Sequence, residues 1–186
     1  MINITTTGLG IYRLDSELKF GNIHVFLAVA PAPMRLMQEY AEIESAVRFR
    51  TRGSYLVKNE RDMINFKESN VAWTDSTFFR VFTVPLIDGD ATTALRDPHS
   101  IAISETIASK YFPEGGAVGK TLILDNNRKQ TVTAVFEDMP ATGHFRFDIL
   151  LPLSGRDEAQ SQDMMAANFQ TYFLLRPEAD REALSA

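Results

Sequence analysis

Residues 100–121 read SIAISETIASKYFPEGGAVGKT and contain the clearest structural pattern in the chain. SIAIS predicts a strand, and Ser104 at its end is a suitable N-cap for the helix that follows. Pro113 and the next glycines are typical of a helix end. The helix itself carries an apolar stripe at helical spacing, made of Ile107, Ala108, Tyr111 and Phe112.

The last seven of these residues, GGAVGKT, look like the phosphate-binding loop of an ATPase. That loop needs a glycine, four residues and then Gly-Lys-Ser/Thr, placed between a strand and a helix. Here only three residues separate Gly115 from Gly119, and Glu114 stands where the first glycine belongs. The predicted helix also precedes the loop instead of following it, so no helix N-terminus faces a phosphate. We therefore expect a helix end and a turn here, without a nucleotide site.

Composition limits the class of protein. The chain has 186 residues, of which 45% are hydrophobic and 23% charged, as in one globular domain or two small ones. The formal charge is −5 without a Lys/Arg block, which argues against a nucleic-acid partner. No apolar run reaches the ~20 residues that cross a bilayer, and no signal peptide is visible. The chain is expected to be either cytosolic or a soluble piece of a larger membrane protein.

The absence of cysteine excludes disulfides, thiolate metal sites and cysteine nucleophiles. It does not decide the compartment, because many bacterial envelope proteins also lack cysteine.

Extended segments surround one helix in the first part of the chain. IYRLDSELKF (11–20) and IHVFLAV (23–29) predict a hairpin that turns at Gly21–Asn22. MRLMQEY (34–40) has apolar residues at three-residue spacing, which predicts a helix packed on a sheet.

SAVRFRTR (45–52) alternates cleanly and predicts a half-buried strand. Val47 and Phe49 share the apolar face. The other face is a basic stripe, which is most often solvated but could also meet an acidic partner. We treat its members as candidate interface residues: Arg48, Arg50 and Arg52.

The later elements are predicted from the same signals, namely apolar spacing, capping residues and turn residues. They are a helix over 75–82 capped by Asp75 or Ser76, a hairpin of strands 121–125 and 130–138, a buried strand over 146–153, a polar helix over 156–167 and a strand over 169–175. The final residues, PEADREALSA, begin a helix inside which the sequence stops, so we expect a truncated domain.

Residues with catalytic or metal-binding chemistry are scattered. His24, His99 and His144 have no partner at ligand spacing, and Asp88 and Asp90 lack the other oxygen ligands of a calcium loop. The residues alone therefore predict an α+β protein without a catalytic constellation, a metal or a cofactor.

Short phrases occur in a specific order and spacing along the middle of the chain. They are Asp75-Ser76-Thr77-Phe78-Phe79, Pro85-Leu86 with Gly89-Asp90, Ile103-Ser104-Glu105, Lys110-Tyr111-Phe112, Gly119-Lys120, Val135 with Asp138 and Pro140, and His144-Phe145 with Phe147-Asp148. Together they resemble the MacB-like periplasmic core domain. This domain lies between the first two transmembrane helices of ABC transporter permeases with an FtsX-like membrane part. The resemblance covers about residues 11–184 and is strongest to Bacteroidetes-type permeases.

The resemblance implies an α+β fold of two mixed α/β subdomains. A porter-like βα subdomain would be formed by both chain ends, residues 10–66 and 144–186, with the second part truncated. A Sabre-like subdomain, residues 67–143, would be inserted between them. The pattern of residue types along the sequence also changes near these boundaries. Lys67–Val71 and Pro140–Phe145 are therefore candidate hinges.

The resemblance further implies a non-catalytic periplasmic domain of an inner-membrane protein, with no cofactor. Such a domain would couple ATP-driven movement in the cytoplasm to export or extraction of an envelope substrate, by mechanotransmission. The implied partners are a second permease copy, a cytoplasmic ATPase domain or subunit reached through membrane helices, and a periplasmic adaptor.

Two alternatives remain open. An extracytoplasmic module that senses a ligand or peptide would have an apolar pocket lined by residues such as Trp73, Phe78, Phe82 and Leu86. A nucleotide-using enzyme would depend on GGAVGKT.

Overall fold

The fold was analysed in a computed structural model. It describes residues 2–8, 11–20, 23–27, 32–51, 53–61, 65–143, 145–160 and 169–179.

The chain divides into two compact units. The first unit combines residues 1–50 and 156–186, and the second unit comprises residues 51–155. The subdomain boundaries expected from the sequence, at 66/67 and 143/144, both fall inside the second unit. The assignment of porter-like and Sabre-like subdomains remains a prediction.

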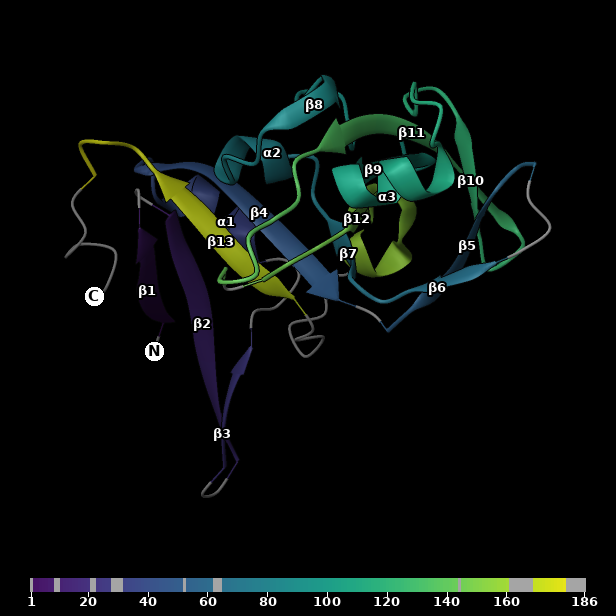
Figure 1. The fold of residues 1–186 in the computed structure, drawn as a ribbon. Coiled ribbons are helices and arrows are strands. Elements are labelled where there is room, and N and C mark those ends of the chain that lie inside the picture. The colour runs from purple at the N-terminus through teal and green to yellow at the C-terminus, as the bar shows by residue number, and fades with distance from the viewer. Residues whose placement is uncertain are drawn as a thin grey trace. The chain divides into compact units, whose positions relative to one another are not determined.

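The first unit contains an antiparallel sheet (Figure 1). Its strands run in the order β1-β2-β13-β4, and β3 also pairs with β2. Because β13 lies between β2 and β4, hydrogen bonds join segments from the two ends of the chain. The elements are β1 (Ile2–Gly8), β2 (Ile11–Phe20), β3 (Ile23–Leu27), α1 (Ala32–Glu39), β4 (Ile43–Thr51), a 3-10 helix (Asp157–Gln160) and β13 (Gln170–Leu175).

Apolar residues from β2, β4 and β13 form the core of this unit. Leu36 and Tyr40, from α1 and the residue after it, pack against this cluster. Phe49 and Tyr172 stack across the β4–β13 pair with ring centroids 5.4 Å apart, which adds to the burial of each. The buried members of the cluster are Tyr12, Ile43, Ala46, Phe173 and Leu175.

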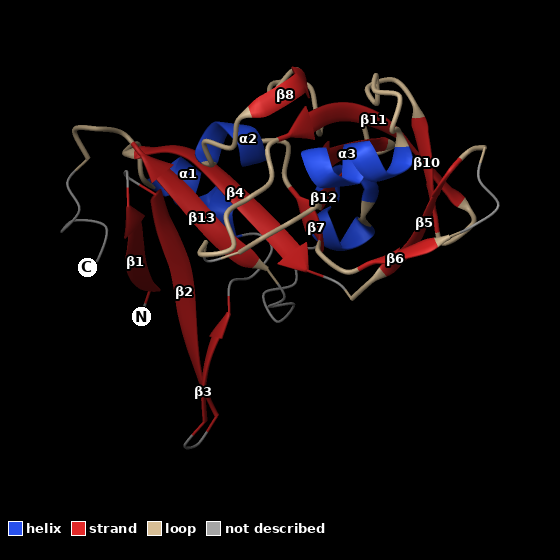
Figure 2. Ribbon diagram, in the orientation of Figure 1, coloured by secondary structure: helices blue, strands red, loops and turns tan. Residues whose placement is uncertain are grey.

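The second unit contains a large mixed sheet with short helices (Figure 2). Its strands run in the order β7-β12-β9-β11-β10-β5-β6, and β8 pairs with β11. The pairs β7–β12 and β9–β11 are parallel and the others are antiparallel. The elements are β5 (Tyr55–Asn59), β6 (Phe66–Glu68), β7 (Val71–Thr74), α2 (Phe78–Val81), β8 (Leu86–Gly89), β9 (Ser100–Ser104), α3 (Glu105–Tyr111), β10 (Thr121–Leu124), β11 (Arg128–Phe136), β12 (Ile149–Pro152) and a 3-10 helix (Leu153–Gly155).

Three neighbouring strands of the second unit, β7, β12 and β9, are covered on both faces. Every residue of β7, β9 and β12 is buried, which explains their continuous apolar runs. The helix α3 packs on β9 and β11. Its apolar stripe supplies this contact, since Ile107 and Tyr111 are buried.

The pattern in residues 100–121 is confirmed. The Ser104 hydroxyl accepts the Ile107 N–H at 3.4 Å, as a helix N-cap should. The helix ends at Tyr111, and Gly115 and Gly116 both have positive φ. The chain then enters β10, so a helix precedes GGAVGKT and a strand follows it.

Other elements also agree with the sequence patterns. The first hairpin forms with Phe20 opposite Ile23, and β10 pairs with β11 around Asp125 and Asn126. Both turn residues have positive φ, at 48° and 63°, as the short Asx-rich turn predicts. In the strand β4, residues 47–50 alternate as expected between buried and half-buried, whereas Ser45, Ala46 and Val47 are all buried.

Some boundaries differ from the predicted ones. The helix expected over 75–82 is reduced to α2, and its N-cap is Thr77, whose side chain does not make the capping hydrogen bond. Neither Asp75 nor Ser76 is the cap, because residues 75–77 form a turn in which Phe78 N–H donates to the Asp75 carbonyl. The strand expected over 146–153 is shorter. The polar helix expected over 156–167 begins as a 3-10 helix, and the rest of it lies outside the described residues.

We expect Gly89→Ala to destabilise the chain strongly. Gly89 has φ +93°, and an added Cβ would lie 2.4 Å from the Thr133 carbonyl oxygen on the neighbouring strand. The overlap with backbone and the unfavourable φ together should cost about 3 kcal/mol of unfolding free energy in chemical denaturation.

Gly116→Ala is the matched control. Gly116 has φ +61° but no atom within 4 Å of an added Cβ. Its loss should stay at roughly 1–2 kcal/mol, the cost of the left-handed backbone alone. Equal losses for the two variants would show that β8 and β11 do not approach this closely.

Candidate functional site

The basic stripe on β4 is partly used within the first unit. The Arg48 guanidinium donates to the Ala159 carbonyl oxygen at 3.0 Å and lies 5.6 Å from the Phe169 ring centroid. Both Arg48 and Arg50 are half-buried. Arg48 therefore connects the sheet to the segment before β13. Arg52 lies outside the described residues, and a role of the stripe as an interface remains a prediction.

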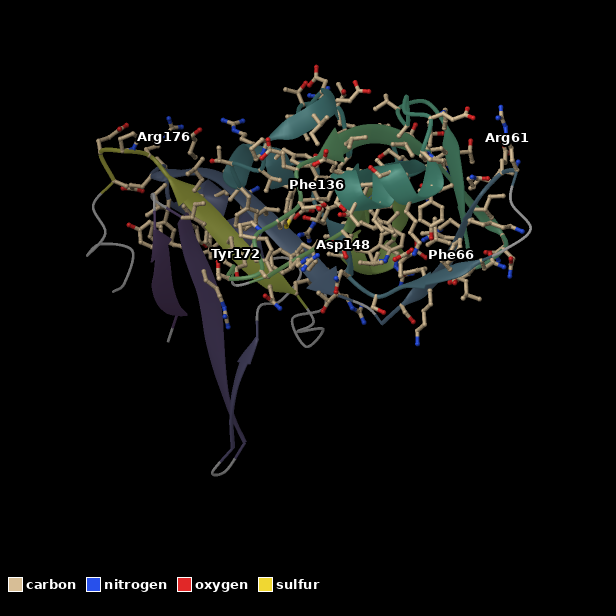
Figure 3. The ribbon with its side chains drawn as sticks, in the orientation of Figure 1. Arg61, Phe66, Phe136, Asp148, Tyr172 and Arg176 are labelled. Carbon is tan, nitrogen blue, oxygen red and sulfur yellow. The ribbon has the colours of Figure 1, made fainter. Side chains whose placement is uncertain are left out.

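The candidate hinge Lys67–Val71 spans two different environments. Lys67 is exposed on β6, and Val71 is buried at the start of β7, where it pairs with Ile149. The Asn70 side chain donates to the Asp148 carboxylate at 2.7 Å, and the Asn70 carbonyl accepts the Asp148 N–H. This segment is thus joined by main-chain and side-chain hydrogen bonds to Asp148, the residue before β12, which is labelled in Figure 3.

The candidate hinge Pro140–Phe145 also combines an exposed residue with one that is partly buried. Pro140 is exposed and accepts the Gly143 N–H. Phe145 is half-buried, with its ring 4.8 Å from that of Phe82 and 5.1 Å from that of Phe147. Its ring belongs to the aromatic packing of the second unit. Nothing in this packing tests whether either segment acts as a hinge.

The aromatic residues considered for an apolar ligand pocket are mostly buried. Trp73, Phe78 and Phe82 are at most 8% exposed, while Leu86 is half-buried. Phe78 packs on the Phe82 ring at 5.0 Å, and the Trp73 indole donates to the Tyr55 hydroxyl at 2.8 Å. These side chains fill the core of the second unit, which counts against the ligand-sensing alternative.

A polar network joins β6 to α3. The Tyr111 hydroxyl donates to the Glu68 carboxylate at 2.6 Å, and the Lys110 ammonium binds the same oxygen at 2.7 Å. Lys110 also lies 4.5 Å from the ring centroid of Phe66. Burial, reinforced by the bond to Glu68, raises the pKa of Tyr111 far above its usual value. The phenol stays protonated and acts as a structural donor.

A second polar network surrounds the start of α3. The Asp138 carboxylate accepts the hydroxyl and the N–H of Thr106, the latter at 3.2 Å. These bonds, led by the Thr106 hydroxyl and joined by one from Ser104, lower the pKa of Asp138. Asp138 thus supplements the Ser104 cap from the end of β11. Sequence reasoning found Ser104 but missed Asp138, because no local pattern links a residue after β11 to a helix that precedes it.

GGAVGKT uses its backbone groups within the fold. The Gly119 N–H donates to the Val132 carbonyl at 2.7 Å, and the Lys120 N–H donates to Ala117 at 3.0 Å. The Lys120 ammonium donates to the Gly115 carbonyl at 2.7 Å. Since these N–H groups are engaged and no helix follows, the loop cannot wrap a nucleotide phosphate as an ATPase loop does.

Metal-binding chemistry is sparse in the part of the chain that the structure describes. No group of three His, Asp or Glu side chains gathers there, and His144 lies outside that part. Asp90 instead accepts the N–H and the hydroxyl of Thr92, each at 2.6 Å. These bonds, the hydroxyl first, lower the pKa of Asp90 and explain the IDGD sequence as turn chemistry.

We expect Asp138→Asn to change how stability depends on pH. A carboxylate whose pKa is lower in the folded chain stabilises it above the unfolded pKa, near 4, and this contribution is lost as pH falls through the folded value. The variant should lose about 0.5–1 kcal/mol at pH 7, because the carboxylate is exposed and screened. Its difference from the parent chain should shrink below about pH 4.

Glu137→Gln is the matched control for this measurement. The Glu137 carboxylate makes no hydrogen bond with any described residue. Urea denaturation between neutral and acid pH should therefore leave this variant close to the parent. A constant difference between Asp138→Asn and the parent at every pH would contradict a role for the ionised carboxylate.

Among the described residues, no helix has the length and apolar character needed to cross a bilayer.

No curated protein matches the sequence. The family model of the MacB-like periplasmic core domain matches residues 4–186, and thus begins earlier than the resemblance found in the sequence.

Solved structures of transporter domains have the same fold. A domain of a permease protein from Porphyromonas gingivalis has 25% identity and a TM-score of 0.73, covering 87% of this chain and 69% of that one. The periplasmic region of MacB from Actinobacillus actinomycetemcomitans has 14% identity and a TM-score of 0.68, covering 96% and 80%. The extracellular domain of the noncanonic ABC-type transporter YknZ from Gram-positive bacteria has 12% identity and a TM-score of 0.55, covering 83% and 75%.

The last two likenesses support the mixed α/β fold alone, whereas the family match spans nearly the whole chain. The chain therefore belongs to the MacB-like periplasmic core domain family, the extracytoplasmic domains of ABC transporter permeases.

Proposed function

We propose that this chain is a non-catalytic domain that transmits movement in an ABC transporter permease. ATP binding and hydrolysis would take place on a cytoplasmic ATPase domain or subunit. Membrane helices would carry the movement to this domain, which would help to export or extract an envelope substrate. A second permease copy and a periplasmic adaptor are the further partners that this role requires.

The observation that carries the proposal is the division into two compact units. The backbone passes between them only at 50/51 and 155/156, and each unit has its own buried residues. Units that are individually well packed and joined by few chain crossings can move as bodies. Mechanical transmission needs such bodies and a hinge, and it needs no nucleophile or cofactor.

The use of polar side chains supports a non-catalytic role. Glu68, Lys110 and Tyr111 bind one another, and Asp138 binds Thr106. These side chains have shifted pKa values or are paired with a neighbour. Each case is explained by a contact that holds a strand or a helix in place. Perturbed groups of this kind also occur in structural networks, so they do not require a reaction.

Two places can be proposed for the hinge. The first is at Lys67–Val71 and Pro140–Phe145, where the pattern of the sequence changes. The unit boundaries at 50/51 and 155/156 are the second choice. They differ in one testable respect, because only the first choice would allow β5 to move relative to β10.

Spin-label distances in the full permease, assembled with its ATPase, test the proposal. The chain has no cysteine, so labels introduced within it are unique there. The exposed pair Gln38→Cys and Glu114→Cys has one label on each unit. We expect its distance distribution to differ between the nucleotide-free state and the state with ATP trapped by a hydrolysis-deficient ATPase.

Two further label pairs supply the control and locate the hinge. Asp88→Cys with Glu114→Cys lies within the second unit, so this pair should not change. Leu56→Cys with Glu114→Cys reports on β5, which pairs with β10. A change in this pair would favour the hinge at 67–71. If the Gln38–Glu114 distances are the same in every nucleotide state, the proposed transmission of movement is wrong.

A further inference from the structure

A pocket of about 250 Å³ opens on the second unit where three segments meet. The end of β5 supplies Asn59, Glu60 and Arg61, the C-cap of α3 supplies Phe112, and the turn into β10 supplies Lys120 with its neighbours. Arg61 lies at the tip of the second unit (Figure 3). The pocket is smaller than the usual 300–1,000 Å³ of a site for a whole drug-sized ligand, so it suits a single chemical group.

The acceptors of this pocket are largely occupied. The Asn59 side-chain oxygen accepts the Arg61 N–H at 2.8 Å, and its amide nitrogen donates to the Tyr111 carbonyl at 3.1 Å. The Glu60 carboxylate pairs with the Lys129 ammonium at 2.7 Å, which offsets its charge. A ligand that needs hydrogen-bond acceptors would find few here.

The donors of the pocket remain available. The Arg61 guanidinium forms no hydrogen bond or ion pair with any described residue, and neither does the Thr121 hydroxyl. The Lys120 ammonium uses one donor on the Gly115 carbonyl at 2.7 Å and lies 5.1 Å from the Phe112 ring centroid. An ammonium has three donors, so two remain for a ligand while the Gly115 bond holds the group in place.

The charge balance selects the class of ligand. Among the described residues at the pocket, the Glu60–Lys129 pair has no net charge, so Arg61 and Lys120 contribute two unbalanced positive charges. A phosphate monoester carries a charge of about −1.5 to −2 at pH 7, which matches two cations better than a single carboxylate does. A guanidinium fork and an ammonium point charge are both common phosphate partners.

We propose that this pocket binds a phosphate group through the side chains of Arg61, Lys120 and Thr121. The site differs from an ATPase loop, because the Gly119 and Lys120 N–H groups are already bonded within the fold. The phosphate could belong to a soluble compound or to a lipid headgroup. The inference goes beyond the proposed transmission of movement and does not depend on it.

The test is a titration of the ¹⁵N-labelled 186-residue chain with inorganic phosphate, at constant ionic strength kept with chloride. The amide signals of Arg61, Lys120 and Thr121 should shift together and saturate. Arg61→Gln should weaken binding about tenfold, the range expected for one charge-assisted contact. Lys120→Gln should do the same, whereas Lys120→Arg keeps the charge and should retain binding.

Lys67→Gln is the control that removes an equal charge from an exposed residue outside the pocket, and it should leave phosphate binding unchanged. Unsaturated shifts in the parent chain, or equal binding by the parent and Arg61→Gln, would overturn the proposal.

Sedimentation with phosphatidylcholine vesicles, with and without phosphatidic acid, distinguishes the two sources. Phosphate binding together with sedimentation only on phosphatidic acid supports a lipid headgroup. Phosphate binding without sedimentation supports a soluble phosphate compound.

Discussion

The second unit depends on the complete burial of β9. All five residues of this strand are buried, with β11 parallel on one side and β12 antiparallel on the other. A strand covered in this way must satisfy its polar groups internally, because water cannot reach them. Ser104 meets this need at the end of the strand. Its N–H donates to the Asp148 carbonyl, and its hydroxyl accepts the Ile107 N–H.

The burial of β9 also determines where the surrounding elements lie. Since Ser104 ends β9 and caps α3, the helix must start at the edge of the sheet and return across β9 and β11. Asp138, at the end of the parallel neighbour β11, then lies close enough to bind Thr106. Tyr111 at the other end of α3 reaches Glu68 and so secures β6. Polar residues that could suggest catalysis are in this way accounted for as supports of one helix on one sheet.

Polar side chains that bind one another are consistent with a domain that transmits movement. The pocket at Arg61 and Lys120 differs from this pattern. Elsewhere in the second unit, several charged or hydroxyl groups are paired with a neighbour, as Glu68 is with Lys110 and Asp138 with Thr106. In the pocket, donors outnumber the acceptors that could engage them. GGAVGKT contributes to it through the Lys120 side chain, although its spacing and its flanking elements differ from those of an ATPase loop.

The local structure and the family could both be predicted from the sequence alone. Periodicity predicted β4, β9 and α3, turn chemistry predicted both hairpins, and ordered short phrases predicted the MacB-like domain that the family match then showed. These features depend on neighbouring residues, whose preferences can be read directly from the chain.

The long-range pairs, in contrast, could be identified only in the folded chain. The fold places β5 beside β10, joins Glu68 to Tyr111, directs Arg48 to the Ala159 carbonyl and brings Arg61 and Lys120 to the same pocket. In each case the two partners are far apart in sequence, and many other pairings would satisfy the same alternating pattern. The choice among them is made by the collective burial of strands such as β9, which no short segment encodes alone.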